Sequence, residues 1–350
     1  MSELTPRGLS QSRRAYRFVN RPYYWYRPAQ LATRLRTKAA PDGATRLLRT
    51  AWGSSLECWP DSLGSAIART GVYDLAVAET LARLADPGET VVDAGANVGV
   101  MSNLLAHAVG PDGQVVSFEP HPLIFATLRR NASRWREVQR LARIDIRQAA
   151  VSSRAGALTL HVDPEVFAHN KGTASLEQAR AGDPPQTQTE TSAHTQAGTS
   201  LQEQTDPATS TRTQVATVRL DQELDAPIGV LKLDVEGHEL EALRGTDSLL
   251  SSKSIRDILF EAHVPPPTPV TELLESHGYT IMGIHQGFSR PILSAPTDAY
   301  ERQLWDPPTL IATTQPERAS ERLRRRGWTC LRGRSRLRRT LAEKTSTPPA

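Results

Sequence analysis

The 350-residue chain has little of what defines several large classes of protein. Its only two cysteines, Cys58 and Cys330, lie far apart without metal-ligand spacing, so we expect no disulfide framework. No apolar run reaches the roughly 18 residues that a transmembrane helix needs. The first residues show no apolar segment followed by small residues, as a secretory signal would. These features lead us to expect a cytoplasmic protein.

Several catalytic and nucleotide-binding signatures are also missing. The chain has no Gly-x-Ser-x-Gly elbow for a nucleophilic serine, no Walker loop and no Gly-x-Gly-x-x-Gly dinucleotide loop. It has no His-x-x-x-His or cysteine pair either, so we predict no bound metal. Nucleophilic catalysis and nucleoside triphosphate chemistry are therefore not expected.

Charge is distributed unevenly along the chain. The formal net charge is +4, but residues 1–50 hold eleven basic and two acidic residues, and residues 317–350 hold eleven and three. Residues 51–316 hold 20 basic and 33 acidic residues. We therefore predict one domain over 51–316 between two basic extensions. Its acidic charge argues against nucleic acid as a partner, while the basic ends suit weak contacts with anionic surfaces.

A polar segment interrupts this domain. Thr or Gln occupies 15 of the 29 positions from 186 to 214. Such a composition buries too little apolar surface to offset the entropy of ordering the chain. We predict a disordered insertion over 177–214; a substrate lid is the alternative, without support from composition.

Elsewhere, short apolar strands alternate with amphipathic helices, which predicts an α/β fold: a Rossmann-like, mostly parallel sheet with helices on both faces. The strands expected in the core lie at 90–93, 114–118, 143–148, 228–233, 255–260, 279–284 and 309–312. The helices expected around them lie at 74–85, from 100 onward, 121–133, 238–250 and 270–277.

The most informative stretch is 90–99. A β-branched strand ends at Asp93 and leads into a turn with Gly95 and Gly99 before a helix begins near Val100. Such a turn presents backbone N–H groups to a nucleotide-like ligand, and Gly99 lets helix and ligand approach. The Asp-x-Gly-x-x-x-Gly spacing suits S-adenosylmethionine, which has no phosphate to neutralise. A strand–turn–helix without a ligand is the alternative.

Acidic residues follow four of the predicted strands: Asp93, Glu119, Asp234 and Glu261. Ligands of open parallel sheets bind beyond the carboxyl ends of the strands. There Glu119 can accept both ribose hydroxyls, and Asp93 can orient loop amides or meet an ammonium group. Any one of them alone could be a solvated strand end, but their recurrence indicates a ligand site.

The densest polar cluster begins at Lys232. Strand alternation places Lys232 and Asp234 on one face, and Gly237 lets the chain turn into a helix. Methyl transfer from a sulfonium needs an in-line approach and removal of a proton from the attacking hydroxyl. Asp234, Glu236 and His238 are candidates for that task. The alternatives are a local hydrogen bond for His238, simple charge neutralisation by Lys232, and Mg²⁺ binding by the three candidates.

Five motifs follow one another in order. They are Asp-Ala-Gly-Ala-Asn-Val-Gly from Asp93, Phe-Glu-Pro-His-Pro from Phe118, Ala-Ala-Val from Ala149, Gly-Thr-Ala-Ser-Leu from Gly172, and Leu-Lys-Leu-Asp-Val-Glu-Gly-His-Glu-Leu-Glu-Ala-Leu-Arg-Gly from Leu231. With Gly-Val-Tyr-Asp-Leu at 71–75 and Phe-Glu-Ala-His at 260–263, the segment 71–313 resembles the FkbM family of class I methyltransferases.

The resemblance implies a seven-stranded sheet with a reversed final hairpin, S-adenosylmethionine as donor, and O-methylation of a sugar or polyketide hydroxyl. By motif, the residues implied to line the donor site are Asp93, Gly95, Asn97, Gly99 and Glu119, with Ala150 and Val151 near the adenine. Those implied to face the methyl group and the acceptor are Lys232, Asp234, Glu236 and His238. The polar insertion departs from the family pattern and leaves the acceptor open.

We therefore predict an S-adenosylmethionine-dependent O-methyltransferase acting on a sugar, glycan or secondary-metabolite hydroxyl. The alternative is a protein that has kept this fold, has lost catalysis and binds a membrane or polymer through its basic ends. An RNA methyltransferase is a third possibility, which only the basic ends suggest. The sequence indicates no particular oligomeric state.

Overall fold

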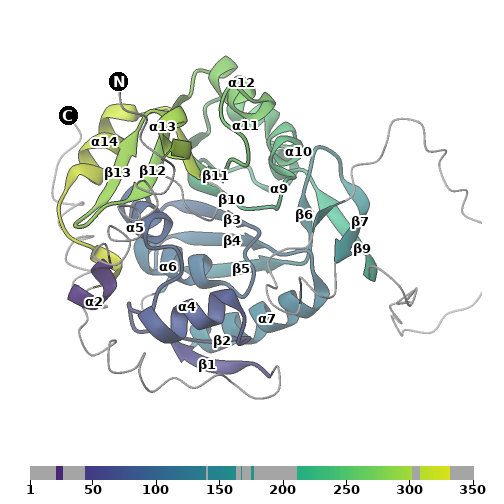
Figure 1. Ribbon diagram of the computed structural model, residues 1–350. Coiled ribbons are helices and arrows are strands. Elements are labelled where there is room, and N and C mark those ends of the chain that lie inside the picture. Colours follow the sequence, from purple (N-terminus) through teal and green to yellow (C-terminus); the bar gives the residue numbers. More distant parts are fainter. Residues whose placement is uncertain are drawn as a thin grey trace, which may run out of the picture.

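The computed structural model describes residues 21–26, 44–138, 141–162, 167, 175–176, 211–301 and 308–331. An eight-stranded sheet with the order β13-β12-β14-β11-β10-β3-β4-β5 forms its centre (Figure 1). The strands of this sheet are β3 (Thr90–Ala94), β4 (Gln114–Phe118), β5 (Arg143–Arg147), β10 (Ile228–Leu233), β11 (Ile255–Glu261), β12 (Thr280–Gln286), β13 (Pro291–Ser294) and β14 (Thr309–Thr313). Strands β3, β4, β5, β10 and β11 run parallel, and β14 is antiparallel to both of its neighbours.

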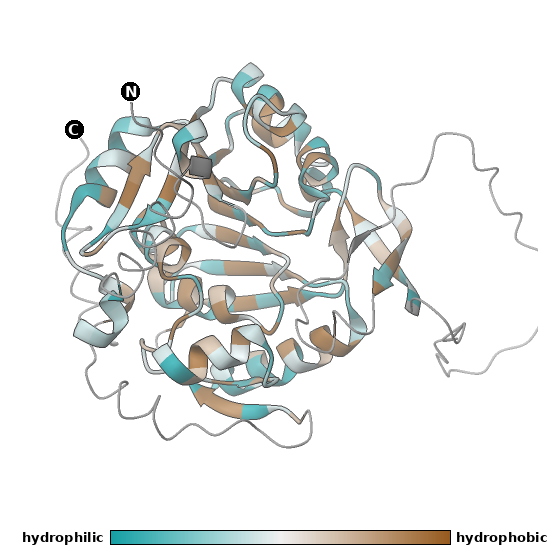
Figure 2. Ribbon diagram, viewed as in Figure 1, coloured by the Kyte–Doolittle hydropathy of each residue, from teal (hydrophilic) through white to brown (hydrophobic). Residues whose placement is uncertain are grey.

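Helices cover both faces of this sheet (Figure 1). On one face lie α4 (Ser62–Thr70), α5 (Leu75–Leu84), α6 (Val100–Val109) and α7 (Pro122–Arg136). On the other face lie α9 (Leu220–Glu223), α10 (Glu239–Arg244), α11 (Asp247–Ser251) and α12 (Pro269–Ser276). Successive strand residues feed opposite cores: Val91 packs with the first group and Val92 with the second. Hydrophobic residues accordingly concentrate in the central strands (Figure 2).

The predicted α/β architecture is confirmed, with two differences. The sheet has eight strands instead of seven, because the short strand β13 pairs with the edge of β12. Strand β13 begins at Pro291, and proline is tolerated in an edge strand, where its missing N–H is not needed for pairing. The helix predicted at 238–250 is divided into α10 and α11 after Arg244.

Two smaller sheets flank the central one. Strands β1 (Arg46–Arg49) and β2 (Ser55–Cys58) form a hairpin, so the predicted N-terminal extension overlaps the domain from residue 46. Strands β6 (Ala150–Val151), β7 (Gly156–Val162), β8 (Ser175–Leu176) and β9 (Thr211–Val218) form the other sheet. The predicted insertion at 177–214 therefore ends too late, since β9 begins at residue 211. Residues 177–210 lie outside the described part of the chain.

The ends of the chain also contribute to the packed structure. Tyr23 and Tyr26 of helix α2 (Pro22–Tyr26) pack against the first core. Helix α13 (Pro296–Glu301) lies beside β12, and α14 (Pro316–Arg324) packs beside α5 and β13. The turn η1 (Thr329–Leu331) follows α14 and packs against α5. The basic tail predicted from residue 317 is thus wrong up to residue 331, and residues 332–350 lie outside the described chain.

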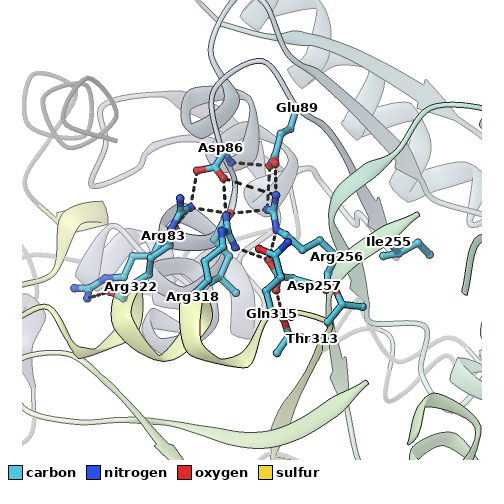
Figure 3. Close-up of polar contacts among 12 residues, drawn as sticks. Arg83, Asp86, Glu89, Ile255, Arg256, Asp257, Thr313, Gln315, Arg318 and Arg322 are labelled. Carbon is cyan, nitrogen blue, oxygen red and sulfur yellow. Dashed lines mark hydrogen bonds and ion pairs between the residues drawn. The ribbon is translucent and has the colours of Figure 1, made fainter. Parts of the chain in front are cut away.

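Ion pairs hold α14 against the rest of the domain (Figure 3). Arg318 donates to Asp86 Oδ2 at 2.6 Å and to Asp257 Oδ2 at 3.0 Å. Arg322 donates to Asp86 Oδ1 at 2.5 Å, and Arg256 donates to Asp257 Oδ2 at 2.9 Å. Arginines that composition assigned to a solvated tail therefore neutralise carboxylates at the amino ends of the central strands. Among the described residues, no helix is long and apolar enough to cross a membrane.

Candidate active site

A cavity of about 530 Å³ lies at the carboxyl ends of β3, β4, β10 and β11. Ligands bind at this edge in open α/β sheets, and the volume is within the usual range of small-molecule sites. Of the predicted site residues, those that line the cavity are Gly95, Asn97, Glu119, Ala150, Val151, Lys232, Asp234 and Glu236. Asp93, Gly99 and His238 do not line it.

The turn after β3 has a backbone that depends on glycine. Gly95, Asn97 and Gly99 have φ angles of 76°, 50° and 90°. A Cβ on Gly95 would lie 1.7 Å from the Asp234 carbonyl oxygen, so a side chain there would separate the loop from β10. The backbone of this turn therefore reaches the cavity only because residue 95 is glycine.

Gly99 allows the start of α6 to pack closely against α7. A Cβ there would lie 2.6 Å from Leu128 Cδ1 and 2.9 Å from Trp135 Cη2, both on α7. The expectation that Gly99 gives room to a ligand is not met, because its open side faces α7 and not the cavity. Sequence alone could not distinguish a helix–helix approach from a helix–ligand approach.

Asp93 lies beneath the loop with no exposed surface. Its Oδ2 accepts a hydrogen bond from Ser102 Oγ at 2.6 Å, and its Oδ1 lies 3.3 Å from Lys232 Nζ. Lys232 Nζ also lies 3.1 Å from Asp234 Oδ2 and donates to the Gly95 carbonyl at 3.4 Å. Burial disfavours its charge, but Asp234 and Asp93 outweigh that and raise the pKa of Lys232. Lys232 thus ties the loop after β3 to the end of β10.

Glu119 lies at the end of β4, with 6% of its surface exposed. Its two oxygens accept hydrogen bonds from the backbone N–H groups of Asn97 and His121, each at 2.9 Å. Burial raises the pKa of Glu119 to about 7, although these hydrogen bonds act in the opposite direction. Each oxygen keeps a lone pair for a further donor, such as a ligand hydroxyl.

Glu236 and Glu261 face the same cavity from neighbouring strand ends. Glu236 has a φ angle of 50°, an uncommon conformation for a residue other than glycine, and one that often occurs at functional sites. Burial, with Asp234 and Glu239, raises the pKa of Glu236 to about 7. Burial, with Asp234 and Glu236, raises that of Glu261 to about 8. At neutral pH these carboxyls are therefore poised to exchange protons.

His238 lies outside the cavity. Its Nε2 is 3.0 Å from Ser152 Oγ, and only 4% of the residue is exposed. Burial lowers its pKa, which keeps the ring neutral. Its predicted place at the acceptor side is thus not what the structure shows, because the chain turns at Gly237 (φ 89°) and directs His238 toward the segment after β6. The described residues contain no group of three or more His, Cys, Asp or Glu suited to hold a metal ion.

Comparison with known proteins shows to which family the chain belongs. The family profile described as "Methyltransferase FkbM domain" matches residues 93–281, more than half of the chain. The 31-O-demethyl-FK506 methyltransferase FkbM of Streptomyces tacrolimicus is 33% identical over 206 residues, which are 56% of this chain and 74% of that protein. The chain belongs to the FkbM methyltransferase family. It is accordingly a methyltransferase, as the sequence predicts.

Two solved structures show some similarity to this FkbM-family chain. Methyltransferase FkbM from Methylobacillus flagellatus KT is 15% identical, with a TM-score of 0.37, over 72% of this chain and 61% of that one. Aeropyrum pernix fibrillarin in complex with S-adenosyl-L-methionine is 12% identical, with a TM-score of 0.33, over 79% and 84%.

The structure adds cavity residues to the predicted set. Those to which the sequence assigned no donor or acceptor role include Tyr73, Asp74, His121, Glu261, His263, Gln286 and Thr309, and of these only Glu261 was expected near the ligand, as a strand-end carboxylate. Five of them stand within motifs that carry the resemblance to the FkbM family: Tyr73, Asp74, His121, Glu261 and His263. The motifs therefore held the signal, but sequence could not show that these separate segments meet. Gln286 and Thr309 lie at the ends of β12 and β14, which carry no motif.

The raised pKa of Glu261 makes the stability of this FkbM-family protein depend on pH. In the folded protein Glu261 keeps its proton up to about pH 8, whereas its ordinary pKa is 4.5. Between these values the folded state binds more protons than the unfolded state, so this group destabilises the fold as pH rises. We expect E261Q to gain thermal stability relative to wild type between pH 5.5 and pH 8.5, by roughly 5–10 °C for a change of about 3 kcal/mol. Thermal unfolding of both proteins at both pH values checks this, and an equal change in the two would contradict it.

Proposed function

We propose that the protein transfers a methyl group from S-adenosylmethionine to a hydroxyl of a sugar, glycan or secondary metabolite. The observation that carries this proposal is the shared cavity, which Glu119, the Gly95 turn, Asp234 and Glu236 all line. Glu119 and the turn suit a nucleoside donor, and Asp234 and Glu236 suit an acceptor hydroxyl.

The residues present fit this donor. Glu119 keeps acceptor capacity for ribose hydroxyls, and Ala150, Val151 and Leu160 offer an apolar wall to an adenine ring. The donor has a cationic sulfonium and no phosphate. Correspondingly, the cavity wall has several carboxylates, and Lys232, its only Lys or Arg among the described residues, is already paired with Asp234 of the wall and with the buried Asp93.

For this reaction the protein must position the acceptor hydroxyl and remove its proton. Bound S-adenosylmethionine would supply an electrophilic methyl group, which a hydroxyl attacks in line. Glu236 lines the cavity, and its pKa of about 7 suits a general base near neutral pH. Asp234 is held by Lys232 at 3.1 Å and is better suited to orient the acceptor than to take its proton.

The acceptor class rests on two considerations. The Streptomyces relative is named for 31-O-methylation of FK506, a hydroxyl of a metabolite. In this chain Tyr73, Asp74, His263 and Gln286 also line the cavity, and their polar groups suit an acceptor with several hydroxyls. A cytoplasmic location belongs to the same proposal, and the unpaired thiols of Cys58 and Cys330 fit it.

The proposal is tested with S-adenosylmethionine labelled in the methyl group. Purified protein is incubated with the glycans and metabolites of a cell extract, and the labelled products are treated with alkali. We expect label in small molecules or glycans as alkali-stable methyl ethers. Label only in nucleic acid, or only as alkali-labile esters, would contradict the acceptor class. No label in any fraction would favour a binding protein that has lost catalysis.

A further inference from the structure

Carboxylates surround the cavity from four separate elements. Asp74 precedes α5, Glu119 ends β4, Asp234 and Glu236 follow β10, and Glu261 ends β11. The other charged or titratable groups on or beside this wall are Tyr73, Asp93, His121, Lys232, Glu239 and His263. The wall is therefore strongly acidic around one ammonium group.

That ammonium group does not neutralise Glu236 or Glu261. Lys232 Nζ lies 3.3 Å from Asp93 Oδ1 and 3.1 Å from Asp234 Oδ2. Within the described chain, neither Glu236 nor Glu261 forms a hydrogen bond or an ion pair through its carboxyl group. Two carboxyls thus face the cavity without a direct ion pair, and the charge of Lys232 lowers their pKa values less than burial and Asp234 raise them.

The charge of Glu236 also acts on Glu261. Leu233 of β10 pairs with Phe260 of β11, so the strand ends that carry Glu236 and Glu261 are adjacent. Like charges in a partly buried site disfavour each other's ionisation. Repulsion from Glu236 contributes, after burial and Asp234, to the pKa of about 8 for Glu261, while burial, Asp234 and Glu239 raise the pKa of Glu236 to about 7. Without a cation in the cavity, the pair therefore retains a proton near neutral pH.

We propose that Glu236 and Glu261 respond to the positive charge of the donor: the pair releases a proton when the cationic donor binds and regains one from the acceptor hydroxyl during transfer. This rests on the proposed function and deepens it. A sulfonium near the pair favours both carboxylates in ionised form. The pair is then ready to accept a proton at the moment when the donor's charge is consumed.

The cycle balances in atoms and charge. The acceptor O–H bond breaks and its proton passes to the carboxylate, while a bond forms between that oxygen and the methyl carbon. The electron pair of the broken carbon–sulfur bond stays on sulfur, which leaves a neutral thioether. The net reaction converts an alcohol and a sulfonium into an ether, a thioether and one proton. The carboxyl pair releases this proton to solvent when the donor binds, and the proton of the acceptor hydroxyl later replaces it on the pair.

A consequence is that the cavity distinguishes the donor from its product by charge. S-adenosylhomocysteine has the same skeleton without the sulfonium charge, so it lacks the attraction to this pair. We expect S-adenosylmethionine to bind about tenfold more tightly than S-adenosylhomocysteine at pH 8, a ratio that corresponds to about 1.4 kcal/mol. The ratio should decrease as pH falls toward 6, because the pair then holds its protons more firmly.

Calorimetric titration of the full chain tests this without any acceptor. Each ligand is titrated at pH 7 in two buffers with different ionisation enthalpies, which gives the number of protons released. We expect S-adenosylmethionine to release a substantial fraction of a proton and S-adenosylhomocysteine to release almost none. E236Q and E261Q should each reduce both the release and the affinity ratio, while still binding S-adenosylhomocysteine. E275Q is the matched control, because Glu275 is exposed on α12 away from the cavity.

Two outcomes are distinguishable. If both ligands bind with equal affinity and equal proton release, the charge response is wrong and the proposed function stands. If neither ligand binds, the proposed function fails and the charge response fails with it. Unchanged proton release in both E236Q and E261Q would also overturn the assignment, since another group would then carry the proton.

Discussion

Replacing Glu236 with glutamine is expected to reduce methyl transfer by roughly 10²- to 10⁴-fold, the usual contribution of a positioned general base. Glutamine preserves the size of the side chain but cannot take the acceptor's proton. Binding of S-adenosylhomocysteine should change little, because Glu119 and the Gly95 turn remain intact. The measurement is transfer of labelled methyl to the acceptor fraction of a cell extract, together with calorimetric binding.

The pH profile separates this role from a structural one. Wild-type kcat/KM for S-adenosylmethionine, which reports the donor-free enzyme, should rise with pH through about 7 as Glu236 loses its proton, since only the ionised form accepts one. E236Q should lose this rise, and the control E275Q should keep both the rise and the rate. If E236Q turns over at the wild-type rate, Glu236 is not the base and Asp234 becomes the candidate.

Removing residues 316–350 is expected to prevent stable folding, whereas removing 332–350 should leave the domain folded. Leu323, Trp328, Cys330 and Leu331 are each at most 2% exposed, so the longer deletion uncovers the first core. A single W328A substitution should cost roughly 3–5 kcal/mol of unfolding free energy, as large-to-small core changes do. Denaturant unfolding followed by fluorescence or circular dichroism measures both effects.

Buried polar groups of α5 also depend on the C-terminal segment that this deletion removes. Glu79, which has no exposed surface, accepts hydrogen bonds from the backbone N–H groups of Thr329 at 2.7 Å and Cys330 at 2.9 Å. Arg83 donates to the carbonyls of Arg325 at 2.6 Å and Gly327 at 2.5 Å. Without these partners, the side chains of Glu79 and Arg83 retain only each other among the residues that the structure describes. If the protein lacking 316–350 unfolds at the same denaturant concentration as wild type, this account of the C-terminal segment is wrong.

The sequence predicted the parts of this fold that local pattern determines. The strand at Thr90 with its glycine turn, and the strand that leads to Asp234, are read correctly because both are apolar runs ended by an acidic residue. The edge strand β13 was missed because it has four residues and its pairing with β12 is decided by packing. The arginines of α14 were assigned to a tail because their carboxylate partners, Asp86 and Asp257, lie far away in sequence.

The site was predicted as far as its residues occupy recognisable motifs. Glu119 and Glu236 line the cavity, whereas His238 turns away after Gly237 and contacts Ser152. Glu261 was recognised as a strand-end carboxylate, but its partnership with Glu236 required the pairing of β10 with β11. Burial and repulsion by nearby carboxylates raise the pKa values of these two groups, and both are properties of the folded arrangement and not of the local sequence.

The claim that this cavity holds the methyl donor is tested most directly by calorimetric titration of S-adenosylhomocysteine into wild type, E119A and the exposed-site control E275A. Wild type should bind one equivalent, E119A should bind at least about tenfold more weakly because charge-assisted hydrogen bonds are lost, and E275A should bind as wild type. No binding by wild type at millimolar ligand, or equal binding by wild type and E119A, would contradict the account.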